Sequence, residues 1–141
     1  MKGEKIMELS EKLLNYLKST GIPASINQNF LLTDLNKVLY SATFDNNEYY
    51  NNQKLSNYLI ELINIWKNEE NYEKLYILAN KQNYPIIQKD SKEYSAQIIL
   101  PIYLKSELQG FAIFFRYNGY FIESSMKAPT TIRNWIMTHL Q

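Results

Sequence analysis

The side chains that most often perform catalysis are scarce in this sequence. It has no cysteine and a single histidine, His139, close to the C-terminus. A metal centre needs several converging nitrogen, oxygen or sulfur ligands, and a nucleophilic triad needs a base beside an activated serine or cysteine. One histidine meets neither requirement, so we expect His139 to be an exposed cation near the C-terminal end of a helix. The sequence predicts no metal site and no cofactor.

Carboxylates could still act as an acid and base pair. The candidates all fall in expected turns or at the ends of expected elements, where acidic residues commonly cap and solvate the chain, and no spacing selects a pair. The glycines are too scattered for a phosphate-binding loop. We therefore predict a protein without catalytic residues, and a small carboxylate enzyme is the weakest alternative. The candidate acids are Asp34, Asp45, Glu48, Asp90, Glu93, Glu107 and Glu123.

Charge and hydropathy exclude further classes of partner. The 15 basic and 14 acidic residues are interspersed, and only Arg116 and Arg133 are arginine, the residue best suited to phosphate and base recognition. No apolar run is long enough to cross a membrane, and residues 1–18 lack the apolar segment of a signal peptide. We expect no direct contact with nucleic acid, no membrane association and a cytoplasmic location.

The first elements that could position a site are a helix and a hairpin. The chain of 141 residues has the length of one domain, and we expect a single domain over residues 1–141. Apolar residues recur at spacings of three and four over 4–20, which predicts an amphipathic helix. Strand-like runs at 24–32 and 38–44 flank a turn rich in Asp and Asn, which predicts a β-hairpin.

A second helix is expected over 53–68, because its leucines and Trp66 lie on one face. The following segment is ambiguous. Residues 75–79 could be a short strand or a helical turn, and residues 84–87 are expected to be extended because Pro85 disfavours a helix at the preceding residue.

The strongest hairpin signal comes next, in apolar runs at 94–104 and 108–117. Pro101 predicts an edge position or a bulge near the end of the first run, and Gly110 predicts a bulge or a close backbone approach in the second. A last helix is expected over 122–140. It should either start or kink at a proline, Pro129.

This order of elements predicts an α+β fold with a central, mainly antiparallel sheet, helices at both termini and one inserted helix. The twelve tyrosines are the one unusual component. A ring with a polar tip suits a pocket or an interface, but it also suits an ordinary sheet surface.

Three stretches resemble the GAF family, and in particular the GAF-like domain at the C-terminus of stage V sporulation protein T, a transcription regulator of spore-forming bacteria. They are FLLTDLNKVLYSAT at 30–43, NEYYNNQKLSNYLIELI at 47–63 and YSAQIILPIYLKSELQGFAIFF at 94–115. One helix stands where that regulator has its DNA-binding domain, so DNA binding does not carry over. The resemblance implies a fold of the GAF, PAS or profilin kind. It also implies a non-catalytic regulatory or sensor domain that binds a small ligand or transmits a signal through a homodimer.

If a ligand pocket exists, the GAF geometry and the placement of the aromatic residues indicate which residues line it. These are Tyr49, Tyr50, Leu55, Tyr76, Tyr84 and Gln97. The alternative function is a protein-interaction adaptor of PAS-, roadblock- or longin-like topology without a ligand.

The apolar stripes of the two terminal helices allow two arrangements, which periodicity does not separate. They could pack on the sheet, or they could pair with a second copy of the chain. In the second case the dimer interface would include Leu9, Leu13, Leu17, Ile132, Trp135 and Ile136.

Overall fold

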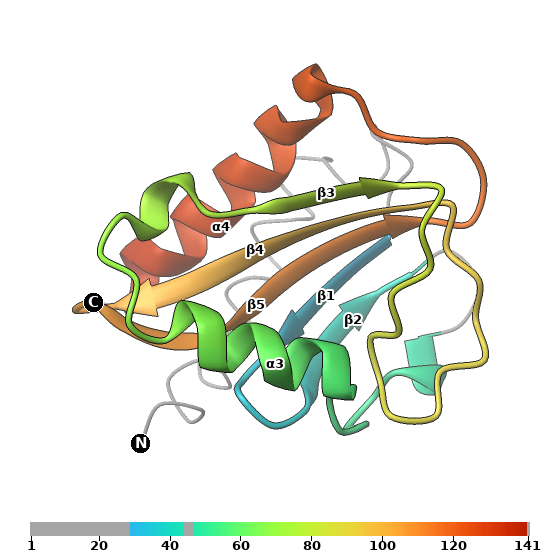
Figure 1. Cartoon of the computed structure of the whole chain (residues 1–141), viewed down its shortest axis with the longest axis horizontal. Helices are drawn as coiled ribbons and strands as arrows, with labels where there is room; N and C mark the ends of the chain where they lie inside the picture. The colour runs from blue at the N-terminus through green and yellow to red at the C-terminus, as the bar shows by residue number, and fades with distance from the viewer. Residues whose placement is uncertain (1–28, 44–46, 141) are drawn as a thin grey trace.

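A computed structural model of the chain describes residues 29–43 and 47–140. Its centre is an antiparallel five-stranded sheet with the strand order β2-β1-β5-β4-β3 (Figure 1). The two β-hairpins therefore lie side by side, joined through β1 and β5. The strands are β1 Asn29–Thr33, β2 Val38–Ala42, β3 Ile77–Asn80, β4 Ala96–Leu104 and β5 Glu107–Arg116.

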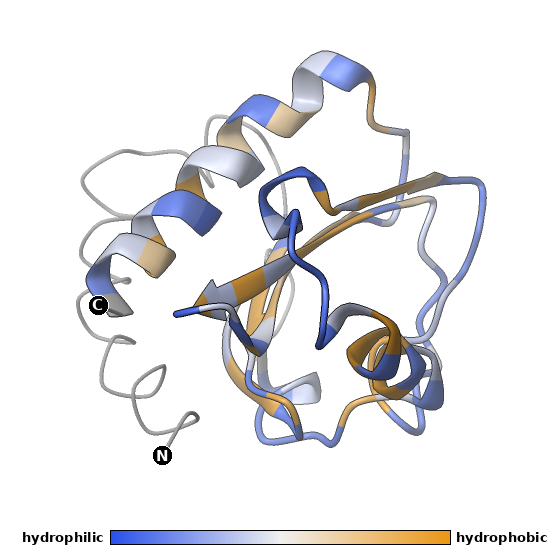
Figure 2. Cartoon of the chain, turned by 60° about the vertical axis from the view of Figure 1, so that its left-hand side comes forward, coloured by the Kyte–Doolittle hydropathy of each residue, from blue (hydrophilic) through white to orange (hydrophobic). Residues whose placement is uncertain are grey.

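Helices cover both faces of this sheet, so the predicted α+β fold is confirmed. α3 spans Asn57–Trp66 and α4 spans Lys127–Leu140, and Figure 2 shows them on opposite sides of the sheet. Three short 3-10 helices lie in the connections that the structure describes. They are η1 Asn47–Tyr49, η2 Tyr72–Lys74 and η3 Glu123–Met126. The helix expected over 4–20 lies outside the described residues.

The alternation of side chains along the strands divides the core into two layers. On one face, Ile98 and Phe114 pack with Ile132 and Ile136 of α4. The other face packs against α3 and the segment that follows it. Its buried residues include Leu31, Leu59, Trp66, Ile99, Phe111, Ile113 and Phe115.

Both hairpin turns follow from local chemistry. Between β1 and β2, the Asp34 carboxylate accepts hydrogen bonds from the backbone N–H groups of Asn36 and Lys37, each at 2.7 Å. Between β4 and β5, Lys105 and Ser106 have φ angles of 51° and 67°, a left-handed pair that matches the twist of a two-residue hairpin turn. These turns fix the register of each strand pair.

Pro101 and Gly110 lie where the sequence predicted irregular positions. β3 pairs with β4 only as far as Ile99, so Pro101 lies beyond its end, on an open edge. At Gly110, a Cβ atom would lie 1.9 Å from the carbonyl oxygen of Thr33. Only glycine therefore fits at this point, and the predicted close backbone approach is confirmed.

The second helix begins four residues later than expected. Residues 53–56 are extended, and single β-bridges join Lys54 to Lys37 and Leu55 to Ile87. Ser56 then caps α3, because its hydroxyl oxygen accepts a hydrogen bond from Leu59 N at 3.3 Å. Leu55 matches the spacing of the apolar residues in α3, which is why the sequence placed it in the helix. It is buried, but its backbone is extended.

The last helix also starts differently. η3 precedes it, and Pro129 lies in the first turn of α4, where its missing N–H leaves no helical hydrogen bond unmade.

Candidate functional site

The structure brings most of the predicted ligand-binding residues to one face of the sheet. Tyr50, Leu55 and Gln97 are fully buried, whereas Tyr49 and Tyr84 are half-buried. Tyr49 and Tyr50 meet edge to face, with their ring centroids 4.8 Å apart. The remaining predicted residue, Tyr76, is 43% exposed and is not joined to them by any of these contacts.

Asp90 organises the hydroxyl groups of these tyrosines. Its carboxylate accepts hydrogen bonds from Tyr94 at 2.7 Å and from Tyr49 at 3.1 Å, and from two backbone N–H groups, those of Ile86 and Lys92. The Tyr50 hydroxyl lies 2.8 Å from that of Tyr94. We call Tyr49, Tyr50, Tyr94 and Asp90 the tyrosine cluster.

Burial raises the pKa of Tyr50 and of Tyr94 far above the ordinary value of 10.0. The hydrogen bond between Tyr50 and Tyr117 raises the pKa of Tyr50 further, and the neighbouring Tyr50 raises the pKa of Tyr94. Both phenols therefore keep their protons and act as neutral hydrogen-bonding groups. The tyrosine cluster ties the segment around η1 to the loop that precedes β4.

Gln97 and Tyr84 form a second link on this face. The Gln97 side chain donates to the Tyr84 carbonyl at 2.6 Å and accepts from the Tyr84 N–H at 3.3 Å. The Tyr84 ring stacks on Tyr58 of α3, with the centroids 4.2 Å apart. The amide of Gln97 is thus used to hold the loop against the sheet.

An open cleft lies elsewhere, between η2 and α4, with a volume of about 530 Å³. We call it the η2–α4 cleft. Two segments far apart in the sequence form its walls, and most of its lining is polar. The lining residues are Tyr72, Glu73, Thr130, Arg133, Asn134, Met137 and Thr138.

Arg133 is the buried charge of this cleft, with only 4% of its surface exposed. Its Nε donates to Asn134 Oδ1 at 2.8 Å, whereas its two terminal nitrogens reach the carbonyls of Pro101 and Glu73 only at 3.5 Å. Burial lowers the pKa of the guanidinium below its usual value, and the negative charge of Glu73 opposes that shift.

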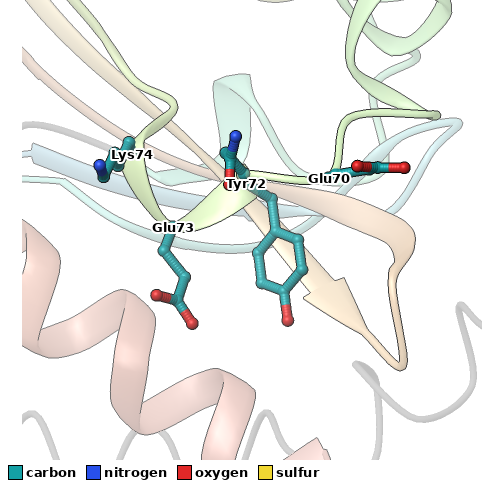
Figure 3. Close-up of a pocket in the computed structure, with 5 residues that line it drawn as sticks. Glu70, Tyr72, Glu73 and Lys74 are labelled. Atoms are coloured by element: carbon teal, nitrogen blue, oxygen red, sulfur yellow. The ribbon is translucent and has the colours of Figure 1, made fainter.

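Tyr72 and Glu73 form the opposite wall. Figure 3 shows both side chains extending from η2 on the side where α4 lies, whereas Lys74 and Glu70 point to either side. The Tyr72 ring also stacks on Tyr103 of β4, with the centroids 4.5 Å apart, which fixes the start of η2 against the sheet. A smaller hollow of about 240 Å³ adjoins the cleft along residues 70–74.

The sequence did not single out this cleft. The sequence feature that could have indicated the cleft is Arg133, a charged residue directly beside the apolar stripe of Ile132 and Ile136. Of the predicted dimer residues on this helix, Ile132 and Ile136 are buried against the sheet of their own chain. Trp135 is half-buried and stacks on the exposed His139, with the ring centroids 4.0 Å apart. Leu9, Leu13 and Leu17 lie outside the described residues.

Within residues 29–43 and 47–140, no three His, Cys, Asp or Glu side chains come close enough together to hold a metal ion. Over the same part of the chain, no helix combines the length and the apolar character needed to cross a bilayer.

Comparison with solved structures identifies the class of fold. The cyanobacteriochrome receptor PixJ matches with a TM-score of 0.69 and 11% identity, over 99% of this chain and 97% of the other. The phycoerythrobilin-bound GAF domain of a cyanobacterial phytochrome matches with a TM-score of 0.60 and 9% identity, over 99% and 94%. No protein-family model and no curated protein matches the sequence. The chain has the GAF fold.

Proposed function

We propose that this chain is a non-catalytic regulatory domain that binds a small ligand in the η2–α4 cleft. The cleft itself is the observation that supports this most directly. Its volume of about 530 Å³ falls within the range of roughly 300–1,000 Å³ that is typical of small-molecule sites. A few polar groups converge in it beside one apolar side chain, Met137. A solved GAF domain with a bound bilin shows that the fold accommodates ligands in another protein.

The position of the cleft suggests how binding would be transmitted. One wall belongs to η2 and the other to α4, and α4 also packs on β4. A ligand that contacts both walls would favour the arrangement in which they lie close together, because it binds that state more tightly. The signal would then leave the domain through α4.

Two finer features belong to the same proposal. The domain acts as a homodimer, and because Ile132 and Ile136 are already buried, a dimer through α4 would use the other sides of this helix. Its role is in transcription regulation in the cytoplasm, as the resemblance to stage V sporulation protein T implies.

Native mass spectrometry of the purified chain tests the proposal. We expect a dimer mass, together with an additional mass that disappears on denaturation and belongs to a co-purified small molecule. A thermal-shift screen of common metabolites should also raise the melting temperature for at least one compound. A monomer would refute the dimer, and no bound or stabilising compound at all would refute ligand binding.

A protein-interaction adaptor is the second candidate. Its specific support is Ile60 and Ile65 of α3, which are 40% and 61% exposed. Substituting both with serine should leave the melting temperature nearly unchanged and abolish binding to a protein partner, if the adaptor function holds.

A further inference from the structure

Within the part of the chain that the structure describes, the guanidinium of Arg133 is buried without an ion pair to a carboxylate. Among the described residues its contacts are one side-chain amide oxygen and two distant carbonyls. A guanidinium has five N–H donors, and contacts at 3.5 Å are at the limit of a hydrogen bond. Arg133 therefore retains donors for a further acceptor, and it lines a cleft large enough to admit one.

A carboxylate satisfies this requirement best. The planar fork of arginine pairs with the two oxygens of a carboxylate in a bidentate manner, and such charge-assisted hydrogen bonds are stronger than neutral ones. A buried charge without its counter-ion is costly, so a ligand that supplies the counter-ion gains affinity. The two terminal nitrogens contact the backbone carbonyls of Pro101 and Glu73 at 3.5 Å, and neither contact supplies a negative charge.

The opposite wall of the cleft carries the opposite charge. Glu73 is exposed at its side chain, extends toward α4, and acts on Arg133 through its charge without forming an ion pair with it. This negative charge disfavours a ligand with two negative charges, such as a phosphate monoester. The Glu73 charge favours a ligand that carries a positively charged group close to the carboxylate bound by Arg133.

We propose that the η2–α4 cleft binds a small zwitterion, namely a free amino acid or a close analogue. Its carboxylate pairs with Arg133 and its ammonium group with Glu73. This proposal rests on the proposed function, that the cleft binds a small ligand. The Thr130 and Asn134 side chains line the polar part of the cleft. Met137, which packs against both core layers, offers an apolar surface for the side chain of the ligand.

Isothermal titration calorimetry of the full chain with the common L-amino acids tests this directly. Each amino acid that binds is compared with its amide, which lacks the carboxylate, and with the corresponding acid that lacks the ammonium group. We expect each analogue to bind at least roughly tenfold more weakly than the amino acid, because it leaves one charge of the cleft unpaired.

Three variants sharpen the test. Arg133→Lys keeps the charge but not the fork, and should weaken amino-acid binding by about tenfold or more. Glu73→Gln should weaken amino-acid binding and strengthen binding of the acid that lacks the ammonium group, since its repulsion is gone. Glu70→Gln, beside the cleft but not lining it, should change neither. Circular dichroism and melting temperature confirm that each variant is folded.

The outcomes separate the two proposals. If metabolites without a carboxylate bind and Arg133→Lys has no effect on them, the zwitterion assignment is wrong while the proposed function stands. If Glu73→Gln affects the acid and the amino acid in the same direction, Glu73 does not bind the ammonium group and the assignment is again wrong. If no small molecule of any kind binds, both proposals fail.

Discussion

The hydroxyl oxygens of Tyr50 and Tyr94 lie 2.8 Å apart, although 44 positions separate the two residues in the chain. Tyr50 follows η1, and Tyr94 precedes β4. The Tyr94 hydroxyl is also bonded to Asp90, whose carboxylate receives four hydrogen bonds in total, from Tyr94, Tyr49, and the backbone of Ile86 and Lys92. These side chains therefore fasten two long connections to one another, in addition to the single β-bridge between Leu55 and Ile87.

Substituting Tyr94→Phe should lower the free energy of unfolding by about 1–2 kcal/mol, because a buried hydroxyl with two partners is removed and those partners keep fewer contacts. Urea unfolding followed by circular dichroism measures this. Tyr76→Phe is the matched control, since Tyr76 is 43% exposed, and it should change stability by less than roughly 0.5 kcal/mol. Equal effects of the two substitutions would contradict the structural role of the tyrosine cluster.

Stability should fall in alkaline solution because burial raises the pKa of Tyr50 and Tyr94 above 10.0. In the unfolded chain these phenols lose their protons near pH 10.0, whereas the folded chain retains them. The unfolded state then binds fewer protons, so the free energy of unfolding decreases with pH, by about 1.4 kcal/mol per pH unit for each phenol. The stabilising effect is fully present below pH 10.0.

Urea unfolding from about pH 8 to about pH 11 measures this slope. In the Tyr94→Phe variant, the free energy of unfolding should decline less steeply above pH 10.0, because one of the two phenols no longer contributes. An identical slope in the variant and the wild type would show that Tyr94 titrates normally in the folded protein.

Substituting Gly110→Ala should destabilise the protein severely, by more than about 3 kcal/mol, because the new methyl group would lie 1.9 Å from the carbonyl oxygen of Thr33. The central pair of strands, β1 and β5, would have to separate. Gly119→Ala is the matched control: Gly119 has a φ of 86° and open space around it, so only backbone strain of about 1–2 kcal/mol is expected. Thermal melting of both variants ranks the two costs.

Substituting Ser56→Ala should cost about 1–2 kcal/mol. The hydroxyl caps α3 at Leu59 N and donates to the Pro85 carbonyl at 2.5 Å, so both the helix start and the loop lose a contact. Asn64→Ala, an exposed position of the same helix, should be neutral or slightly stabilising. A neutral Ser56→Ala would show that the cap is not needed for α3.

Sequence periodicity was sufficient to predict the two hairpins of the sheet because each is local, whereas it left the segment of β3 open between a strand and a helical turn. The turns at Asp34 and at Lys105–Ser106 lie between the residues that they join, and the apolar alternation fixes which face each side chain takes. The start of α3 was misplaced for a non-local reason. Leu55 is extended because Ile87 lies beside it, and no local pattern contains that neighbour.

The candidate site was harder to predict than the fold. The GAF resemblance and the placement of the aromatic residues predict that Tyr49, Tyr50 and Tyr84 line a pocket, and this ligand-binding role stays a prediction. Nothing in the sequence indicated that the polar groups of these residues are bonded within the protein. Arg133 contacts the carbonyl of Pro101, which lies beyond the end of the β3–β4 pairing at Ile99. The length of β3 and the point at which its pairing with β4 ends are set by tertiary packing, so local sequence patterns do not predict them.

The position of β5 in the sheet also governs the order in which the protein can form. β5 lies at the centre of the sheet, where its Phe114 pairs with Phe30 of β1, yet among the five described strands it is the last to be synthesised. An isolated two-stranded hairpin is only marginally stable in water. The β1–β2 hairpin therefore remains weakly stable until β5 has been synthesised and can pair with β1. A nascent chain that stalls before Glu107 exposes the apolar edge of β1, and it is then a substrate for chaperones or for aggregation.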